Sequence, residues 1–198
     1  MNLIAPNNFI KIALLVLLAA PFSATAKADE RTKSTHYAGG FFGQGQLILG
    51  SEDSRYGGGF FYAWGRPEPK FRWGSVPAQA VFEAYADHTH STGASGNPGN
   101  DTWGYGVLAY GRWRWPISHN GWGAYGDFGL GLQYASHSTV DLDSMWNTTP
   151  MGGLGVARQF GSQEFLVGVR LLHISNAGTV GHNQGQNQLF LTLGIRFK

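Results

Sequence analysis

A histidine and a serine near the C-terminus end a stripe of apolar residues. His173 and Ser175 continue the alternation of apolar side chains that runs through residues 165–171. On a strand, residues two apart lie on one face at about 6.5–7 Å, so the imidazole and the hydroxyl can meet. Such a contact allows an imidazole base to activate a hydroxyl. A polar pair on an apolar face is costly unless it has partners or a function.

A third polar side chain is expected on the same face. Leucine, isoleucine and phenylalanine alternate along residues 189–197, and the same parity includes Asn187. This last strand should run antiparallel to the one before it, which brings Asn187 beside His173. We therefore expect His173, Ser175 and Asn187 to converge on the outward face of the sheet.

The first 28 residues have the features of a secretory signal peptide. Lys11 precedes an apolar run over residues 12–20, and small residues follow it. Cleavage is expected after Ala26 or Ala28. A membrane anchor is the alternative, but it needs about 20 apolar residues. The expected mature chain, residues 29–198, is one exported domain.

The composition is typical of a membrane β-barrel. The chain has no cysteine, 30 glycines, 14% aromatic residues and 13% charged residues, where about 25% charged is usual in soluble domains. No later segment is long and apolar enough for a spanning helix, and a β protein crosses hydrocarbon only as a closed barrel. The formal net charge of +2 gives no indication of nucleic-acid binding.

Alternating segments predict an all-β fold, an eight-stranded antiparallel transmembrane barrel. In residues 103–115, Trp113 included, and in residues 122–134, aromatic side chains bracket an aliphatic middle on one face, as in a lipid-facing band with an aromatic girdle at each end. Residues 66–69 contain two prolines and are expected to break any strand. The pattern of residues 148–160 does not show which of their side chains face outward. The expected strands are 41–49, 57–64, 78–87, 103–115, 122–134, 148–160, 163–175 and 187–197.

Loop lengths and interior charges fit the same barrel. The connections at 117–121 and 161–163 are short, and those at 88–101, 136–147 and 176–186 are long, which predicts tight turns at the periplasmic end. The connection at 66–77 is longer than this pattern allows. Side chains just fill an eight-stranded barrel, so we expect a packed scaffold and no pore. The charged residues expected inside are Glu83, Asp87, Asp127, Arg112, Arg114, Arg170 and Arg196.

The last 30 residues resemble the lipid A 3-O-deacylases of the outer membrane, the PagL-type family. Its hallmark is a His-x-Ser-Asn-x-Gly string on the penultimate strand, followed by an Asn-x-Gly element. The corresponding residues here are 173–178, His-Ile-Ser-Asn-Ala-Gly, and 183–185, Asn-Gln-Gly. The resemblance implies an integral outer-membrane barrel that hydrolyses the acyl ester at position 3 of lipid A, with no cofactor and no metal.

The resemblance also implies roles for individual residues. Ser175 would be the nucleophile, and His173 the general base that takes its proton and returns it to the leaving sugar hydroxyl. Asn176 and the backbone amides around Gly178 would stabilise the oxyanion. The substrate would be lipid A, or lipopolysaccharide, in the outer leaflet.

The chain departs from the family pattern at one position. The glutamate that completes the family's triad falls on Asn187. An amide carbonyl can hold a histidine tautomer, but it does not stabilise an imidazolium as a carboxylate does. There are two alternatives. Either Asn187 orients His173 and the deacylase activity is weaker, or a loop acid, Asp141 or Asp143, takes the role of the triad acid.

Other interpretations of the sequence remain open. An inactive barrel that binds lipopolysaccharide or another surface through its long loops is compatible with Asn187. An acyltransferase is also possible, although no pocket for a phospholipid donor is apparent. His88 and His90 are spaced like two metal ligands on one strand face, but without an obvious third ligand we expect solvated loop histidines.

Overall fold

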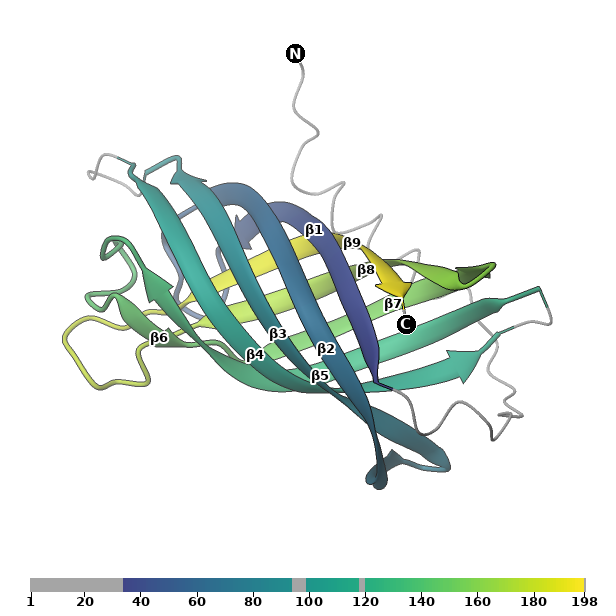
Figure 1. The fold of residues 1–198 in the computed structure, drawn as a ribbon. Coiled ribbons are helices and arrows are strands. Elements are labelled where there is room, and N and C mark those ends of the chain that lie inside the picture. The colour runs from purple at the N-terminus through teal and green to yellow at the C-terminus, as the bar shows by residue number, and fades with distance from the viewer. Residues whose placement is uncertain (1–33, 94–98, 118–119, 198) are drawn as a thin grey trace, which may run out of the picture.

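The computed structural model describes residues 34–93, 99–117 and 120–197. Its strands are β1 (Thr35–Gln46), β2 (Arg55–Trp73), β3 (Val76–Ser91), β4 (Asp101–Pro116), β5 (Trp122–Ala135), β6 (Trp146–Thr148), β7 (Met151–Phe160), β8 (Gln163–Ile174) and β9 (Gln186–Phe197). Every pairing is antiparallel, and the pairing of β4 with β5 closes the sheet into a barrel (Figure 1). β6 and β7 both pair with β5 and occupy one place in the wall. The expected eight-stranded closed barrel is confirmed.

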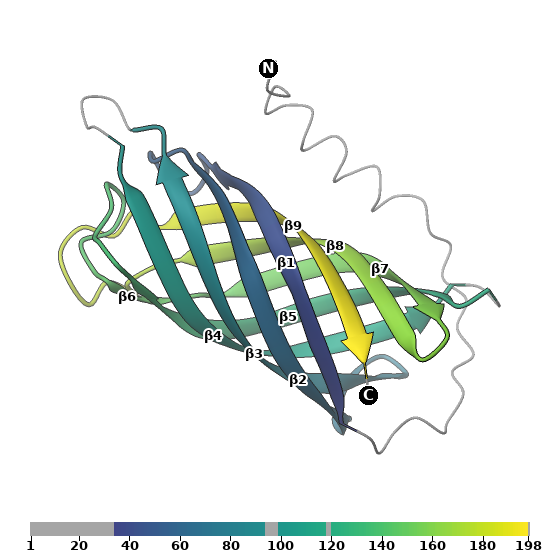
Figure 2. The same cartoon turned by 45° about the horizontal axis from the view of Figure 1, so that its top comes forward.

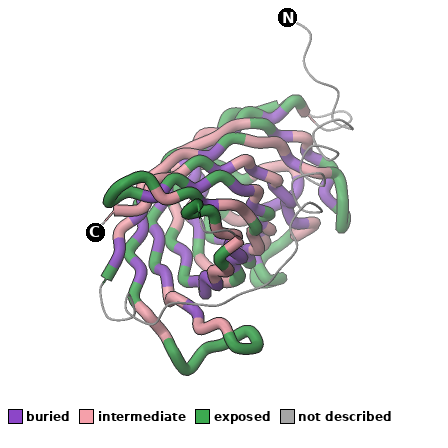
Figure 3. The backbone as a smooth tube through the Cα atoms, turned by 90° about the vertical axis from the view of Figure 1, so that its right-hand side faces the viewer, coloured by how far each residue is buried: buried purple, intermediate pink, exposed green. Residues whose placement is uncertain are grey.

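Side chains alternate between an outward and an inward face, as the buried and exposed bands along the tube show (Figure 3). On β8, Phe165 and Val167 are exposed while Leu166 is buried. On β7, which the sequence left open, Leu154 points outward and Met151 inward. In the described ranges no helix is long and apolar enough to span a membrane.

The interior is held together by ion pairs between charged residues on different strands. Arg170 of β8 binds both carboxylate oxygens of Glu83 of β3, at 2.6 and 3.0 Å. Arg112 binds Asp127 on the neighbouring strand at 2.8 and 2.6 Å. Bidentate ion pairs of this kind satisfy buried charges, whose burial without a partner would cost several kcal/mol of stability. The sequence placed these four residues inside, and it missed Glu164, which pairs with Arg114 and Arg196.

Replacing Glu83 with alanine is expected to lower the free energy of unfolding by about 3–5 kcal/mol, because Arg170, only 5% exposed, would keep a buried charge without its partner. The measurement is the urea midpoint of the barrel in lipid vesicles. A double variant with leucine at both positions should recover most of the loss, since no unpaired charge remains. A single variant as stable as the double one would contradict this account.

The hairpin of β2 and β3 differs from the expectation that residues 66–69 break the strand. β2 continues through both prolines to Trp73 and turns at Gly74, whose φ is +58°, so the turn between β2 and β3 is tight after all. The prolines are tolerated because β1 ends its pairing at Gly65, which leaves that side of β2 as an edge. A register shift between Glu68 and Arg72 takes up the extra residues.

The tip of this hairpin also changes the environment of Trp113. The ring of Trp113 lies 5.1 Å from that of Phe71 and 5.8 Å from that of Trp73. Trp113 is therefore 4% exposed and does not face lipid as expected, although it has the outward parity. Phe71 and Trp73 themselves are exposed.

The N-terminal part of the barrel also departs from the expected limits. β1 spans Thr35–Gln46, so it both begins and ends earlier in the chain than the predicted strand 41–49. The predicted signal peptide, residues 1–28, and residues 29–33 lie outside the described residues. The described chain starts and ends at one end of the barrel, because His36 pairs with Phe197.

Candidate active site at the outer ends of β8 and β9

The register of β8 and β9 places His173 directly opposite Asn187. Ser175 follows β8 and forms a bridge with Thr148 of β6. His173, Ser175 and Asn187 all have the outward parity, at the end of the barrel where the longer loops gather (Figure 2). The structure thus brings His173 and Asn187 into contact, and it places Ser175 on the same face without a hydrogen bond between its hydroxyl and His173. Asn187 is nevertheless 1% exposed, since the β1–β2 loop, residues 47–54, contacts its amide through Ile48.

Two hydrogen bonds fix the orientation of the Asn187 amide. Its Nδ2 donates to the carbonyl oxygen of Ile48 at 2.8 Å, and a carbonyl oxygen can only accept. Oδ1 therefore faces the imidazole, where it lies 2.8 Å from Nδ1 of His173. Because Oδ1 accepts, Nδ1 must carry the proton. His173 is thus held in the tautomer whose Nε2 has a free lone pair.

The Ser175 hydroxyl has partners other than His173. It donates to Oδ1 of Asn183 at 3.1 Å, and it accepts from the backbone N–H of Ala177 at 3.1 Å. Asn183 Oδ1 also accepts from the backbone N–H of Asn176 at 3.0 Å. From the sequence, Asn183 was expected only as the first residue of the Asn-x-Gly element, with no role of its own. The structure makes it the direct partner of the serine.

The structure assigns Asn176 and Gly178 contacts that differ from the expected oxyanion site. The side chain of Asn176 is buried, and its Nδ2 donates to the carbonyls of Val180 and His182 at 2.7 and 3.2 Å. Its Oδ1 accepts from the N–H of Gly178 at 2.9 Å. Both groups therefore stabilise the turn after Ser175, where Gly178 has a φ of +70°. Neither has a donor free for an oxyanion in this conformation.

A family model described as lipid A 3-O-deacylase (PagL) matches residues 55–196. The chain belongs to this family. Among solved structures, that of the outer membrane enzyme PagL is 18% identical, with a TM-score of 0.52, covering 82% of this chain and 98% of that one. Neisserial surface protein A is 20% identical, with a TM-score of 0.54 and coverages of 83% and 96%. No curated protein matches significantly.

This PagL-family chain is an outer-membrane β-barrel. The similarity to the two solved structures shows the fold alone, because a surface protein matches it as well as an enzyme does. Whether this family member carries out chemistry therefore depends on the side chains around His173.

Neither loop acid takes the place of the family's glutamate. The carboxylate of Asp141 is fully buried and accepts from residues 51–53 of the β1–β2 loop. Asp143 accepts from the backbone N–H of His182 at 2.6 Å. Both are committed to loop structure, and the described partner of Nδ1 of His173 is Asn187.

Gly185 packs against the imidazole on the side of Nε2. It has a φ of +75°, and a Cβ added to it would lie 2.7 Å from Cε1 and 3.3 Å from Nε2 of His173. A contact of 2.7 Å requires one of the two groups to move. Gly185 therefore fixes how far the ring can turn toward the loop.

Replacing Gly185 with alanine is expected to lower kcat by about 10-fold or more, since small displacements of a catalytic group are costly. The measurement is the initial rate of acyl release. Gly161→Ala is the matched control, because Gly161 also has a positive φ, +58°, but no atom within 4 Å of an added Cβ. Equal losses of activity in both variants would show that the effect comes from backbone strain and not from contact with His173.

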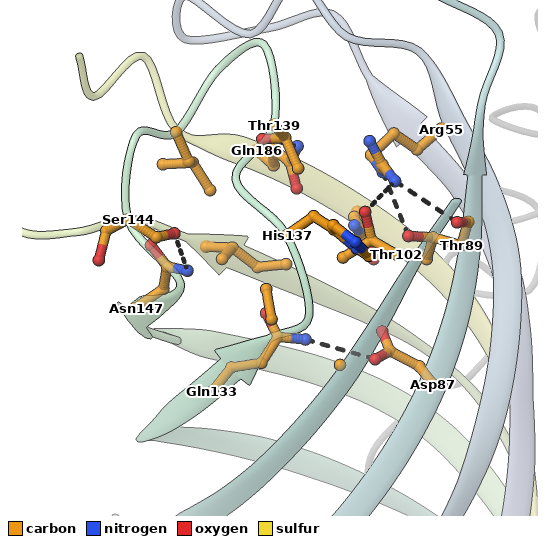
Figure 4. A pocket seen from close by; sticks show the side chains of 15 residues that line it. Arg55, Asp87, Thr89, Thr102, Gln133, His137, Thr139, Ser144, Asn147 and Gln186 are labelled. Carbon is orange, nitrogen blue, oxygen red and sulfur yellow. Dashed lines mark hydrogen bonds between the residues drawn. The ribbon is translucent and has the colours of Figure 1, made fainter. Parts of the chain in front are cut away.

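A polar cavity lies on the lumen side of the same wall. Arg55, Asp87, Gln133 and Asn147 line it (Figure 4). Gln188 of β9, whose parity is opposite to that of Asn187, lines it as well. This lining is unsuited to an acyl chain. This cavity is therefore not a donor pocket of the kind that an acyltransferase needs.

His88 and His90 lie within β3 at its outer end and not in a loop as expected. Asp101, which pairs with His90 across the strands, approaches them at 3.9 and 2.5 Å. The hydrogen bond with His90 lowers the pKa of the Asp101 carboxyl. In the part of the chain that the structure describes, no group of three or more histidine, cysteine, aspartate or glutamate side chains is arranged to hold a metal ion.

Proposed function

We propose that this barrel hydrolyses the 3-O-linked acyl ester of lipid A, with Ser175 as nucleophile and His173 as general base. The observation that carries the proposal is the orientation of Asn187. Its carbonyl oxygen faces Nδ1 of His173 and leaves Nε2 unprotonated on the outward face, two residues from the serine. An amide in this orientation holds the imidazole in the correct tautomer and orientation, which is one of the two roles of the acid in a Ser-His-Asp triad.

The chemistry requires one local change. The Ser175 hydroxyl must rotate from Asn183 to Nε2 of His173, and catalytic hydrogen bonds are often formed only with substrate bound. The oxygen then attacks the ester carbon while Nε2 takes the proton. The sugar oxygen leaves with that proton, and the acyl chain stays on Ser175. Water, activated by the same nitrogen, releases the free fatty acid.

The position of Asn183 Oδ1 suggests where the oxyanion forms. This oxygen lies 3.1 Å from Ser175 Oγ and 3.0 Å from the N–H of Asn176, which suits an acyl oxygen next to an attacking serine. When the substrate oxygen replaces it, the backbone N–H of Asn176 becomes the donor. Asn176 thereby keeps its expected role through its backbone, while Gly178 supports the turn.

The location of the site suits a substrate that stays in the membrane. His173 and Ser175 are on the face that carries Phe165 and Val167 toward lipid, at the end of the barrel with the longer loops. That end faces the outer leaflet if the tight turns are periplasmic. An acyl chain can therefore reach the serine without leaving the bilayer.

The experiment is mass spectrometry of lipid A from a bacterium with ordinary lipid A, with and without the expressed chain. Deacylation predicts lipid A lighter by one hydroxyacyl unit, together with the released fatty acid. A gain of one acyl group would instead indicate transfer. Unchanged lipid A from cells that carry the folded barrel would favour a barrel that only binds lipopolysaccharide.

A further inference from the structure

The β1–β2 loop combines an apolar tip with a direct contact to the candidate active site. Leu47, Ile48 and Leu49 are all exposed, Leu49 at 77%. They follow Gln46, which pairs with Asn187 across β1 and β9. The Ile48 carbonyl then accepts from the Asn187 amide. One loop thus offers apolar side chains outward and a hydrogen-bond acceptor inward.

The second half of this loop is fixed to a buried carboxylate. Asp141, which is 0% exposed, accepts from the hydroxyl of Ser51 at 2.8 Å and from the backbone N–H groups of Glu52 and Asp53 at 2.9 and 3.2 Å. Leu49 has a φ of +53°, an uncommon conformation for a residue with a Cβ. Such a conformation persists only where surrounding contacts impose it. The contacts with Asp141 supply that constraint.

We infer that the β1–β2 loop is a positioning element of the active site: through Ile48 it locks the Asn187 amide in the orientation that keeps Nε2 of His173 unprotonated. The inference rests on the proposed function. It makes Ser51 and Asp141 positioning residues, since they act on His173 only through the loop. The exposed Leu47 and Leu49 form an apolar lip that contacts the acyl chains of the substrate.

The chemistry of position 187 explains why the hydrogen bond from Asn187 to Ile48 is needed. An amide has two unequal ends, and a half-turn would present Nδ2 to His173 and move the imidazole proton to Nε2. The base would then be lost. A carboxylate has two equivalent oxygens and accepts from Nδ1 in either orientation. The hydrogen bond to Ile48 is therefore required because position 187 carries an amide and not a carboxylate.

The test compares loop variants in two backgrounds. Ser51→Ala, a mild change, and Asp141→Asn, a stronger one, are each made in the native chain and in Asn187→Asp, and kcat and KM for lipid A are measured. In the native background we expect kcat to fall by about 10-fold for Asp141→Asn, less for Ser51→Ala, with KM unchanged. In the Asn187→Asp background both losses should shrink to about twofold or less. Equal losses in the two backgrounds, or no loss in either, would overturn the inference.

A second measurement separates the lock from the reaction. The ¹⁵N spectrum of the histidines, with His173 assigned by difference from His173→Gln, reports which ring nitrogen is protonated. We expect an Nδ1–H tautomer in the native barrel and a mixture in Asp141→Asn. If the barrel deacylates nothing but shows this change, the proposed function fails and the positioning role stands. An unchanged tautomer in Asp141→Asn would remove the positioning role.

The apolar lip is tested by Leu49→Gly. Glycine accepts the positive φ of this position without strain, so the backbone and the lock should persist while the apolar contact is lost. The expected result is a rise in KM of about 3- to 10-fold, from the loss of one buried side-chain contact, with kcat and the His173 tautomer unchanged. A fall in kcat with unchanged KM would show that Leu49 contributes to the loop conformation and not to substrate contact.

Discussion

Replacing Ser175 with alanine is expected to abolish acyl release, lowering kcat by about 10⁶-fold, the size seen when a serine hydrolase loses its nucleophile. The reason is that no other hydroxyl in the described structure lies on the outward face two residues from His173. The measurement is the amount of hydroxy fatty acid released from lipopolysaccharide by the purified barrel. Folding should persist, because the bridge with Thr148 uses the backbone of Ser175.

Ser138→Ala provides the control for this variant. Ser138 is an exposed serine on a neighbouring outer loop, and its replacement should leave the rate unchanged. A Ser175→Ala barrel that retains a tenth or more of the activity would show that the nucleophile is a different group.

Replacing Asn187 with leucine is expected to lower kcat by about 10³- to 10⁴-fold, with little change in KM. Leucine has the same branched arrangement of heavy atoms as asparagine, although its methyl groups are larger, and it provides no acceptor for Nδ1 of His173. The imidazole is then free to adopt the wrong tautomer, which costs about 10⁴-fold in a Ser-His-Asp protease. The measurement is kcat as a function of pH.

Asn187→Asp is the contrasting variant. Its carboxylate keeps the acceptor for Nδ1 and stabilises the imidazolium, so kcat should equal or exceed that of the native chain. If Asn187→Leu retained at least a third of the native kcat, the hydrogen bond between Asn187 and His173 would have no part in the reaction.

The strand residues of the site could be predicted from the sequence because a strict period of two leaves only one register. His173, Ser175 and Asn187 follow the parity of their apolar neighbours, and antiparallel pairing then places His173 opposite Asn187. The same parity could have placed Glu164 inside the barrel beside Arg114 and Arg196, a signal that the sequence analysis did not use.

The loop residues of the site could not be predicted in this way, because loops have no period. The contact of Ile48 with Asn187 joins residues 139 positions apart, and that of Asp141 with Ser51 joins residues 90 positions apart. The prolines of residues 66–69 were misleading for a related reason. A sequence does not show that one side of β2 is an unpaired edge, where proline is tolerated.

We propose that Ser175 is a nucleophile activated by His173 on the lipid-facing side of the barrel, and on this activation the deacylase function depends. It is tested most directly by labelling the barrel in lipid vesicles with a long-chain fluorophosphonate, which transfers its phosphonyl group to an activated serine with loss of fluoride. We expect a single phosphonyl group on Ser175 by peptide mass spectrometry, and none in His173→Ala. Labelling at another residue, or equal labelling of Ser175 without His173, would contradict it.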